Sequence, residues 1–246
     1  MKQRLLFALL SALVLASTGA GASTVAQTKE VVSLEGNNLP KGETTVKEPF
    51  RPRFMIGATG GANLSNVLLQ PSLQEEMHLG YDAGLLLRYD VASFAGIWLE
   101  IDYSSRGWEE VADAFPGYRY TRTTNFVHVP VMTHFMIGSG PFKVTVDAGA
   151  HFGYYLGESS TTTPPDDPSL GTPFTGHHET PIQKPFFWGV GGGIGAEYHF
   201  GSHFIAGLRG SYVYGFGDLF NNTRSDIFVK SSEQIISAKL YLLYAF

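Results

Sequence analysis

Hydrophobic and polar residues alternate with a period of two in eight separate segments of the chain. This period is typical of β-strands, because successive side chains of a strand point to opposite faces of the sheet. Each segment has roughly ten residues, which is the length of a tilted strand that crosses a membrane. The segments begin near Arg53, Leu79, Ala95, Arg122, Phe142, Phe186, His203 and Gln234. The pattern therefore predicts an all-β chain of eight strands.

The connections between these segments alternate between short and long. We expect short connections at Asp90–Phe94, Ile137–Pro141 and Gly201–Ser202. We expect long connections at Ser65–His78, Ser105–Thr121, Gly157–Lys184 and Gly215–Glu233. Short turns at one end and long loops at the other are typical of outer-membrane barrels with an even strand count. The predicted fold is an eight-stranded antiparallel up-and-down transmembrane β-barrel, with both barrel termini at the end of the short turns.

The two faces of the predicted strands differ sharply in charge. One face carries no charged residue in any segment, and we assign the opposite face to the lumen as a polar network of Asp82, Arg88, Glu100, Asp102, Lys143, Asp147, Glu197, Arg209 and Lys239. Alternation alone does not say which face is inside, but the aromatic residues of the apolar face do. They form one belt toward the short turns, at Phe54, Tyr89, Phe135, Phe142, Phe200, Phe204, Tyr244 and Phe246. A second belt lies toward the long loops, at Tyr81, Tyr103, Tyr154, Trp188 and Tyr212. Two aromatic belts around an aliphatic band indicate a lipid-facing exterior.

The N-terminus has the features of a secretory signal peptide. Lys2 and Arg4 precede an apolar run from Leu5 to Ala16, and small residues follow up to Ala22. We expect cleavage near Ala22. Residues 23–52 are polar and are interpreted as a periplasmic linker, which leaves residues 53–246 for the barrel.

Composition narrows the function further. The chain has a formal net charge of −5 and no basic run, which argues against nucleic acid as a partner. It has no cysteine. Five glycines lie between Gly189 and Gly195, but a strand follows them where a phosphate-binding loop would open a helix. We expect these glycines to point into the lumen and to make room there for Arg209, Tyr241 or Phe187.

Several short motifs resemble those of the PorT-like outer-membrane β-barrel family of Gram-negative bacteria. They are GATGGANLSN from Gly57, GYDAGLLLRY from Gly80, LEIDYSSRG from Leu99, VHVPV from Val127 and DAGAHFGYYL from Asp147. The final AKLYLLYAF resembles the C-terminal signal that outer-membrane assembly machinery reads, carried by Leu240, Leu242, Tyr244 and Phe246. The resemblance implies a location in the outer membrane. Family members are mostly of unassigned function, and the association of the eponymous member with protein secretion is not transferred to this chain.

Histidines are the main candidates for chemistry. His128, His134 and His151 are expected to face the lumen, and the first two stand roughly 20 Å apart along one strand, too far to share a metal ion. His177 and His178 lie in the longest loop, where surface metal capture is an alternative to an ordinary solvated loop. Ser104 and His128, with Asp102 or Glu100 nearby, suggest a hydrolase as a further alternative. We predict no catalytic residue, no cofactor and no metal.

The expected function is therefore non-enzymatic, with a structural or binding role through long extracellular loops. The expected partners are outer-membrane lipid and lipopolysaccharide, the barrel assembly machinery, and an extracellular or envelope protein of unknown identity, with a monomeric barrel. A lipid-modifying outer-membrane enzyme and a narrow channel for small hydrophobic solutes remain as alternatives.

Overall fold

The computed structural model describes residues 50–71, 73–171, 173, 175–221 and 228–246. The predicted signal peptide and residues 23–49 of the predicted linker lie outside this part of the chain. No helix of the described residues has the length and apolar character needed to cross a membrane.

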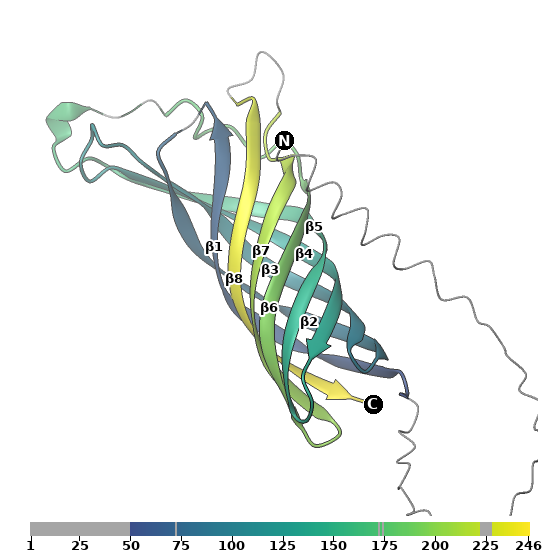
Figure 1. The fold of residues 1–246 in the computed structure, drawn as a ribbon. Coiled ribbons are helices and arrows are strands. Elements are labelled where there is room, and N and C mark those ends of the chain that lie inside the picture. Colours follow the sequence, from purple (N-terminus) through teal and green to yellow (C-terminus); the bar gives the residue numbers. More distant parts are fainter. Residues whose placement is uncertain (1–49, 72, 172, 174, 222–227) are drawn as a thin grey trace, which may run out of the picture. The chain divides into compact units, whose positions relative to one another are not determined.

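Eight antiparallel strands form a closed barrel, which confirms the predicted fold (Figure 1). Each strand pairs with the next, and β1 also pairs with β8 to close the ring. The strands are β1 (Arg53–Gln70), β2 (Glu75–Ala92), β3 (Ala95–Val111), β4 (Arg119–Ile137), β5 (Phe142–Thr163), β6 (Phe186–Phe200), β7 (Phe204–Asp218) and β8 (Lys230–Ala245). A short 3-10 helix, η1 (Pro168–Leu170), interrupts the connection from β5 to β6.

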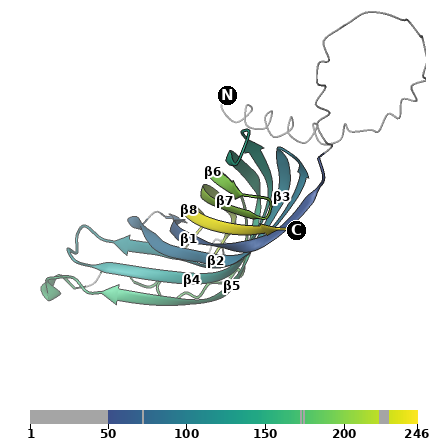
Figure 2. The same cartoon turned by 90° about the horizontal axis from the view of Figure 1, so that it is seen from below.

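The strands are longer than expected, with 15 to 22 residues where the pattern predicts roughly ten. Most of the segment Ser65–His78 is strand, and Ser65 itself pairs with His78. Residues Gly157–Thr163 belong to β5, which projects with β4 from the end of the long connections (Figure 2). Beyond the aromatic belt the outer face of a strand need not be apolar. The alternation is therefore lost while the hydrogen-bond ladder continues. We call the end of the barrel with the long connections the loop end, and the opposite end the turn end.

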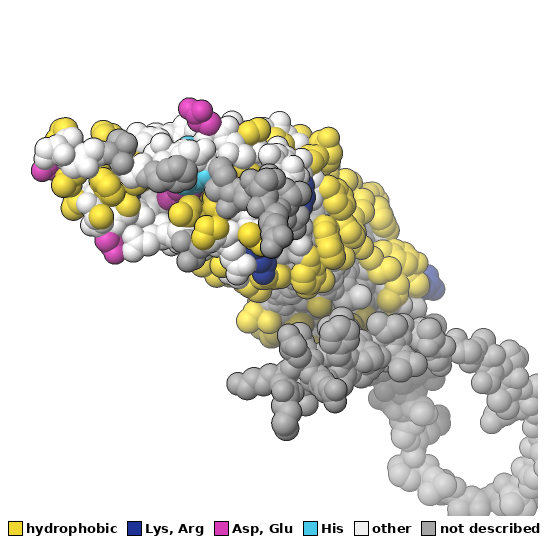
Figure 3. Space-filling model, turned by 90° about the horizontal axis from the view of Figure 1, so that it is seen from above, with side chains coloured by type: hydrophobic (Ala, Val, Ile, Leu, Met, Phe, Trp, Pro, Cys, Tyr) yellow, Lys and Arg dark blue, Asp and Glu magenta, His cyan; other side chains and the backbone are white. Residues whose placement is uncertain are grey.

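The face assigned to lipid is the outer surface of the barrel. All the aromatic residues of the two predicted belts are exposed. The aliphatic residues between them are exposed or half-buried, with Leu240 at 65% and Ile194 at 70% exposure. Seen from the loop end, hydrophobic side chains gather on the part of the barrel wall at the right of the view (Figure 3). An apolar surface of this extent is far larger than a soluble monomer exposes, and it matches the lipid-facing band of a membrane barrel.

The glycine positions make room for large lumen side chains, but the pairs differ from those expected. A Cβ atom on Gly191 would lie 2.6 Å from Nε2 of His151, and one on Gly207 would lie 2.2 Å from the ring of Tyr241. Phe187 lies instead against Gly153 and Gly215. The large ring and its glycine come from different strands, and this match depends on the inter-strand register.

Candidate functional site at the loop end

At the turn end, an ion-pair network crosses the lumen. Arg88 on β2 donates from Nε to Oδ1 of Asp90 at 2.7 Å and from Nη1 to Oε2 of Glu197 at 2.6 Å. Tyr241 and His199 also contact the Glu197 carboxylate. These groups pack beside a buried apolar cluster that is made up of Met55, Leu86, Trp98, Met132, Ile205, Tyr241, Leu243 and Ala245.

A second network fills the middle of the lumen. Lys239 Nζ donates to Oε2 of Glu100 at 2.9 Å and to Oδ2 of Asp102 at 2.5 Å. Arg209 pairs with the same Glu100 from the opposite strand β7. A cavity of about 10 Å³ remains at this level, and it is lined in part by Asp82 and His151. That volume holds at most a single water molecule.

The third layer lies toward the loop end. The guanidinium of Arg106 is stacked between the rings of Phe126 and Phe187, at 3.9 and 4.3 Å from their centroids, and its Nε lies 3.2 Å from Oε1 of Glu233. An apolar cluster follows, made up of Val67, Leu69, Trp108, Phe126, Phe187, Val213, Leu219, Phe220, Phe228 and Ile235. Side chains therefore fill the lumen at each of these levels.

The structure brings most of the predicted lumen residues together. Eight of the nine are buried, and Lys143 at the turn end is partly buried, with its Nζ 3.8 Å from Sδ of Met136. Asp147 contacts His134, and Asp82 lines the central cavity. Three further members of these networks lie in segments predicted as connections: Asp90, Arg106 and Glu233. His134 faces the lumen as predicted.

The three histidines predicted to face the lumen are all buried in the described barrel. His134 Nδ1 lies 2.6 Å from Oδ1 of Asp147, whereas His128 Nε2 lies 3.3 Å from Nδ1 of His151. Ser104 pairs with Phe126 and not with His128, whose partner on β3 is Asp102. Ser104 and His128 both line the central cavity, but no hydrogen bond joins them among the described residues.

The loop end carries a different polar group, which we call the outer cluster: Trp108, Glu110, Tyr120, His177 and His178. The prediction of an ordinary solvated loop is wrong for His177, which is only 5% exposed. Both imidazoles turn inward onto one carboxylate oxygen, with Nε2 of His177 at 2.8 Å and Nε2 of His178 at 3.1 Å from Oε2 of Glu110. Sequence spacing offered no signal for this contact, because the partners are 67 and 68 residues apart.

The outer cluster is rigidly supported. Glu110 and Tyr120 are paired across β3 and β4, and the Tyr120 ring stacks on the His178 imidazole with centroids 3.6 Å apart. Nε1 of Trp108 donates to Oε1 of Glu110 at 2.9 Å. Arg122 forms a two-point ion pair with Glu158 and also donates to the Thr180 carbonyl at 2.7 Å. These contacts hold the β5–β6 connection on the mouth of the barrel.

The two carboxylates at this end differ in their proton affinity. Burial acts to raise the pKa of Glu110, but hydrogen bonds from His177, His178 and Trp108 outweigh it and lower the pKa to about 2. Burial raises the pKa of Glu75 to about 7, against the hydrogen bond from the Leu69 N–H, and the charge of Glu110 adds to the increase. Glu110 is therefore ionised at neutral pH, while Glu75 is only partly so.

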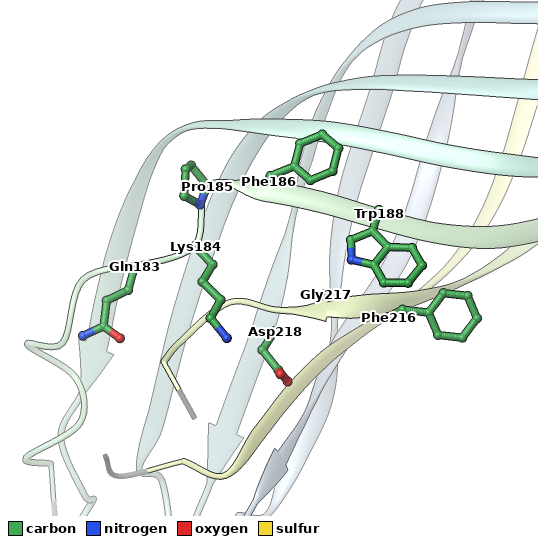
Figure 4. Close-up of a pocket in the computed structure, with 8 residues that line it drawn as sticks. All are labelled: Gln183, Lys184, Pro185, Phe186, Trp188, Phe216, Gly217 and Asp218. Carbon is green, nitrogen blue, oxygen red and sulfur yellow. The ribbon is translucent and has the colours of Figure 1, made fainter. Parts of the chain in front are cut away.

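An open groove of about 490 Å³ lies on the wall of the barrel near the loop end (Figure 4). Trp188 on β6 and Phe216 on β7 form its aromatic side, with ring centroids 5.1 Å apart. Lys184 and Asp218 extend into the space between the two chain segments (Figure 4). Because Trp188 belongs to the belt of exposed aromatics, this groove faces the headgroup level of a membrane.

Solved structures similar to the chain are bacterial outer-membrane proteins. OprG from Pseudomonas aeruginosa is 12% identical, with a TM-score of 0.47 over 79% of this chain and 95% of that chain. A major outer membrane protein from Thermus thermophilus is 15% identical, with a TM-score of 0.45 over 80% of this chain and 100% of that chain. Outer Membrane Protein W from E. coli is 14% identical, with a TM-score of 0.39 over 79% of this chain and 97% of that chain. Likeness at this level transfers no function. No curated protein matches the chain.

The family comparison gives the assignment. Residues 27–221 match the family described as "Outer membrane protein beta-barrel domain". The match covers β1 to β7, and β8 completes the ring by pairing with β7 and β1. The chain therefore belongs to the outer membrane protein beta-barrel domain family.

Proposed function

We propose that this protein is a non-enzymatic component of the outer membrane of a Gram-negative bacterium that acts by binding at its loop end. The packed lumen is the observation that carries the proposal. Three layers of buried charged and aromatic side chains fill it, and the central cavity of about 10 Å³ leaves no path for a solute. Long connections on a rigid scaffold are where binding residues concentrate, and the longest connection here lies at the loop end.

The same packing argues against the two alternatives. A channel for small hydrophobic solutes needs a continuous lumen, and an eight-stranded barrel is only wide enough for side chains. A lipid-modifying enzyme needs its nucleophile within reach of a lipid. Ser104 and His128 are buried inside the barrel, at 1% and 5% exposure, and do not pair with each other.

The sequence supports further proposals on the subfamily, the signal peptide, the assembly signal and the partners. We propose membership of the PorT-like group on the motifs quoted above, and a signal peptide that is cleaved near Ala22. Leu240, Leu242, Tyr244 and Phe246 lie on the lipid-facing side of β8, where the assembly machinery would read them. We propose outer-membrane lipid, lipopolysaccharide and an extracellular or envelope protein as further partners of a monomeric barrel.

Shortening one connection tests the binding role. Residues 167–174, which include η1, would be replaced by two glycines, because β5 and the turn at 176–179 then remain intact. The variant is expected to assemble but to fail to restore the envelope phenotype of a strain that lacks the gene. Heat-modifiable migration on a semi-native gel checks assembly, and the lumen variant Tyr241→Phe serves as the control that restores the phenotype.

A conductance measurement tests the channel alternative. We expect no steady ion conductance in a planar bilayer from the wild type or from the shortened variant, because the packed layers lie inside the barrel. Steady conductance by the wild type, or full complementation by the shortened variant, would contradict the proposal.

A further inference from the structure

We propose that Glu110, His177 and His178 form a binding site for one divalent transition-metal ion, for which Zn²⁺ is the best-suited candidate. This reverses the expectation from sequence that the chain holds no metal. The inference goes beyond the proposed binding role and does not depend on it.

The ligand atoms converge from two distant parts of the chain. Glu110 lies at the loop end of β3, and both histidines lie in the turn at 176–179. Their three ligand atoms lie within 4.8 Å of one another, with Oε2 of Glu110 between the two Nε2 atoms. Ligand atoms of a tetrahedral zinc site, with bonds of about 2.0–2.1 Å, are separated by about 3.3 Å. Small movements of side chains thus suffice to place one ion between them.

The donor set suits zinc. Two imidazoles and one carboxylate are a recognised set of three protein ligands for Zn²⁺, with the fourth position open to water. Magnesium and calcium prefer oxygen ligands alone, so the two nitrogen donors select against them. Among the described residues, this is the one group in which three such ligand atoms lie so close together.

The surroundings hold the ligands in place before any ion arrives. Trp108 fixes the second carboxylate oxygen of Glu110, and Tyr120 stacks on His178. The ring of Phe228 meets the His177 ring edge-on, with centroids 5.6 Å apart. Partners of this kind orient the ligands and raise metal affinity.

The backbone of the turn explains how two adjacent histidines reach the same point. The N–H of His178 donates to the Thr175 carbonyl at 2.9 Å, and the N–H of Thr180 donates to the His177 carbonyl at 3.1 Å. In an extended strand, neighbouring side chains would point to opposite faces. The turn brings both imidazoles to one side, where they meet the carboxylate.

The site also has a route for the ion. The side chains of Glu110 and His178 keep 7% and 11% of their surface exposed, so the cluster borders solvent at the loop end. Without an ion, each imidazole carries a proton on Nε2 and donates it to Glu110. A bound ion replaces both hydrogen bonds by coordination, while the protons shift to the other ring nitrogens or leave to solvent. The bound ion would thereby fasten the β5–β6 connection to β3.

Zinc titration of the purified protein in detergent micelles, without a polyhistidine tag, tests the proposal. We expect one equivalent of Zn²⁺ to bind, and affinity to fall more than roughly tenfold in each of Glu110→Gln, His177→Ala and His178→Ala. His78→Ala is the matched control, because His78 is a loop-end histidine that also lies near one glutamate, with Nδ1 3.4 Å from Oε1 of Glu109. Its removal should leave zinc binding unchanged.

Three further measurements separate loss of zinc binding from a folding defect. Each variant must show the heat-modifiable migration of the wild type. Co²⁺ substitution should give the intense visible absorption of a four-coordinate site in the wild type and in His78→Ala, but not in the three ligand variants. Zinc should also slow proteolysis within residues 164–185 of the wild type and not of His178→Ala. An absence of binding at ~100 µM Zn²⁺ would overturn the proposal, as would binding that the folded ligand variants retain or that His78→Ala loses equally.

Discussion

Nη1 of Arg88 lies 2.6 Å from Oε2 of Glu197, and this bond joins β2 to β6, which stand opposite each other in the ring of eight strands. Both side chains are fully buried. Arg209 on β7 and Glu100 on β3 make the same kind of crossing one strand further around the ring. Opposite walls of the barrel are thus tied directly through the lumen, which is possible only because an eight-stranded barrel is so narrow.

Replacing Arg88 with Met should destabilise the barrel by about 3–5 kcal/mol, because the carboxylates of Glu197 and Asp90 would remain buried without their cation. The double variant Arg88→Met with Glu197→Gln should cost less than the sum of the single changes, since it removes one of those charges as well. Reversible urea unfolding in micelles measures both. A cost below about 1 kcal/mol for the single variant would show that the ion pair between Arg88 and Glu197 does not stabilise the barrel.

Leu240→Arg should destabilise the membrane-inserted barrel by about 2–4 kcal/mol. Leu240 is 65% exposed on the lipid face and stands midway on β8 between Tyr244 at the turn end and Ile236, which pairs with Tyr212 of the loop-end belt. It therefore lies near the bilayer midplane. Val229→Arg, at an exposed position beyond the loop-end belt, is the matched control and should cost about 0–1 kcal/mol. Equal costs at both sites, measured by unfolding in lipid vesicles, would contradict this placement of the membrane band.

Glu75→Gln should stabilise the protein at pH 8 and have little effect near pH 5. The pKa of Glu75 is raised to about 7 in the folded protein, against a usual value of 4.5, so the fold favours the protonated form. Its contribution to stability is therefore lost as the pH rises from about 5 through 7. Glutamine keeps an oxygen that accepts the Leu69 N–H and removes the repulsion from Glu110. Thermal unfolding across this pH range would reveal the crossover, and a gain of the same size at both pH values would refute the titration.

The strand number, the two faces and the aromatic belts could be predicted from sequence, because the bilayer imposes them on every residue that crosses it. Tyr81 and Tyr244 are readable as belt residues from their position on an apolar face alone. The ends of the strands could not be predicted in this way. Strand β2 begins at Glu75, beyond the belt, where no lipid requires an exposed side chain such as that of Glu76 to be apolar.

The pairs of side chains that meet across the barrel could not be predicted from the sequence either. Arg106 meets Glu233, and His178 meets Glu110, only after the register of all strands and the path of one connection are fixed. The charges themselves indicated a lumen network, but the partner of each charge depends on which strands lie opposite each other. The outer cluster depends further on how the β5–β6 connection folds back, and no periodicity reports that path.

Gly207→Ala should destabilise the barrel by about 1–3 kcal/mol through overpacking. A Cβ atom at this position would lie 2.2 Å from the ring of Tyr241, which is 4% exposed and is held by Glu197 and the edge of the Trp98 ring. The ring has no free space to move into, so the strain must pass to the backbone of β7. Gly210→Ala on the same strand is the control, because its Cβ would meet no atom closer than 4.0 Å. Gly207→Ala should cost less free energy of unfolding in a Tyr241→Leu background than in the wild type, because the smaller side chain leaves room for the new Cβ atom. If urea unfolding shows the same cost for Gly207→Ala with and without the tyrosine, contact with the ring is not the reason for glycine at this position.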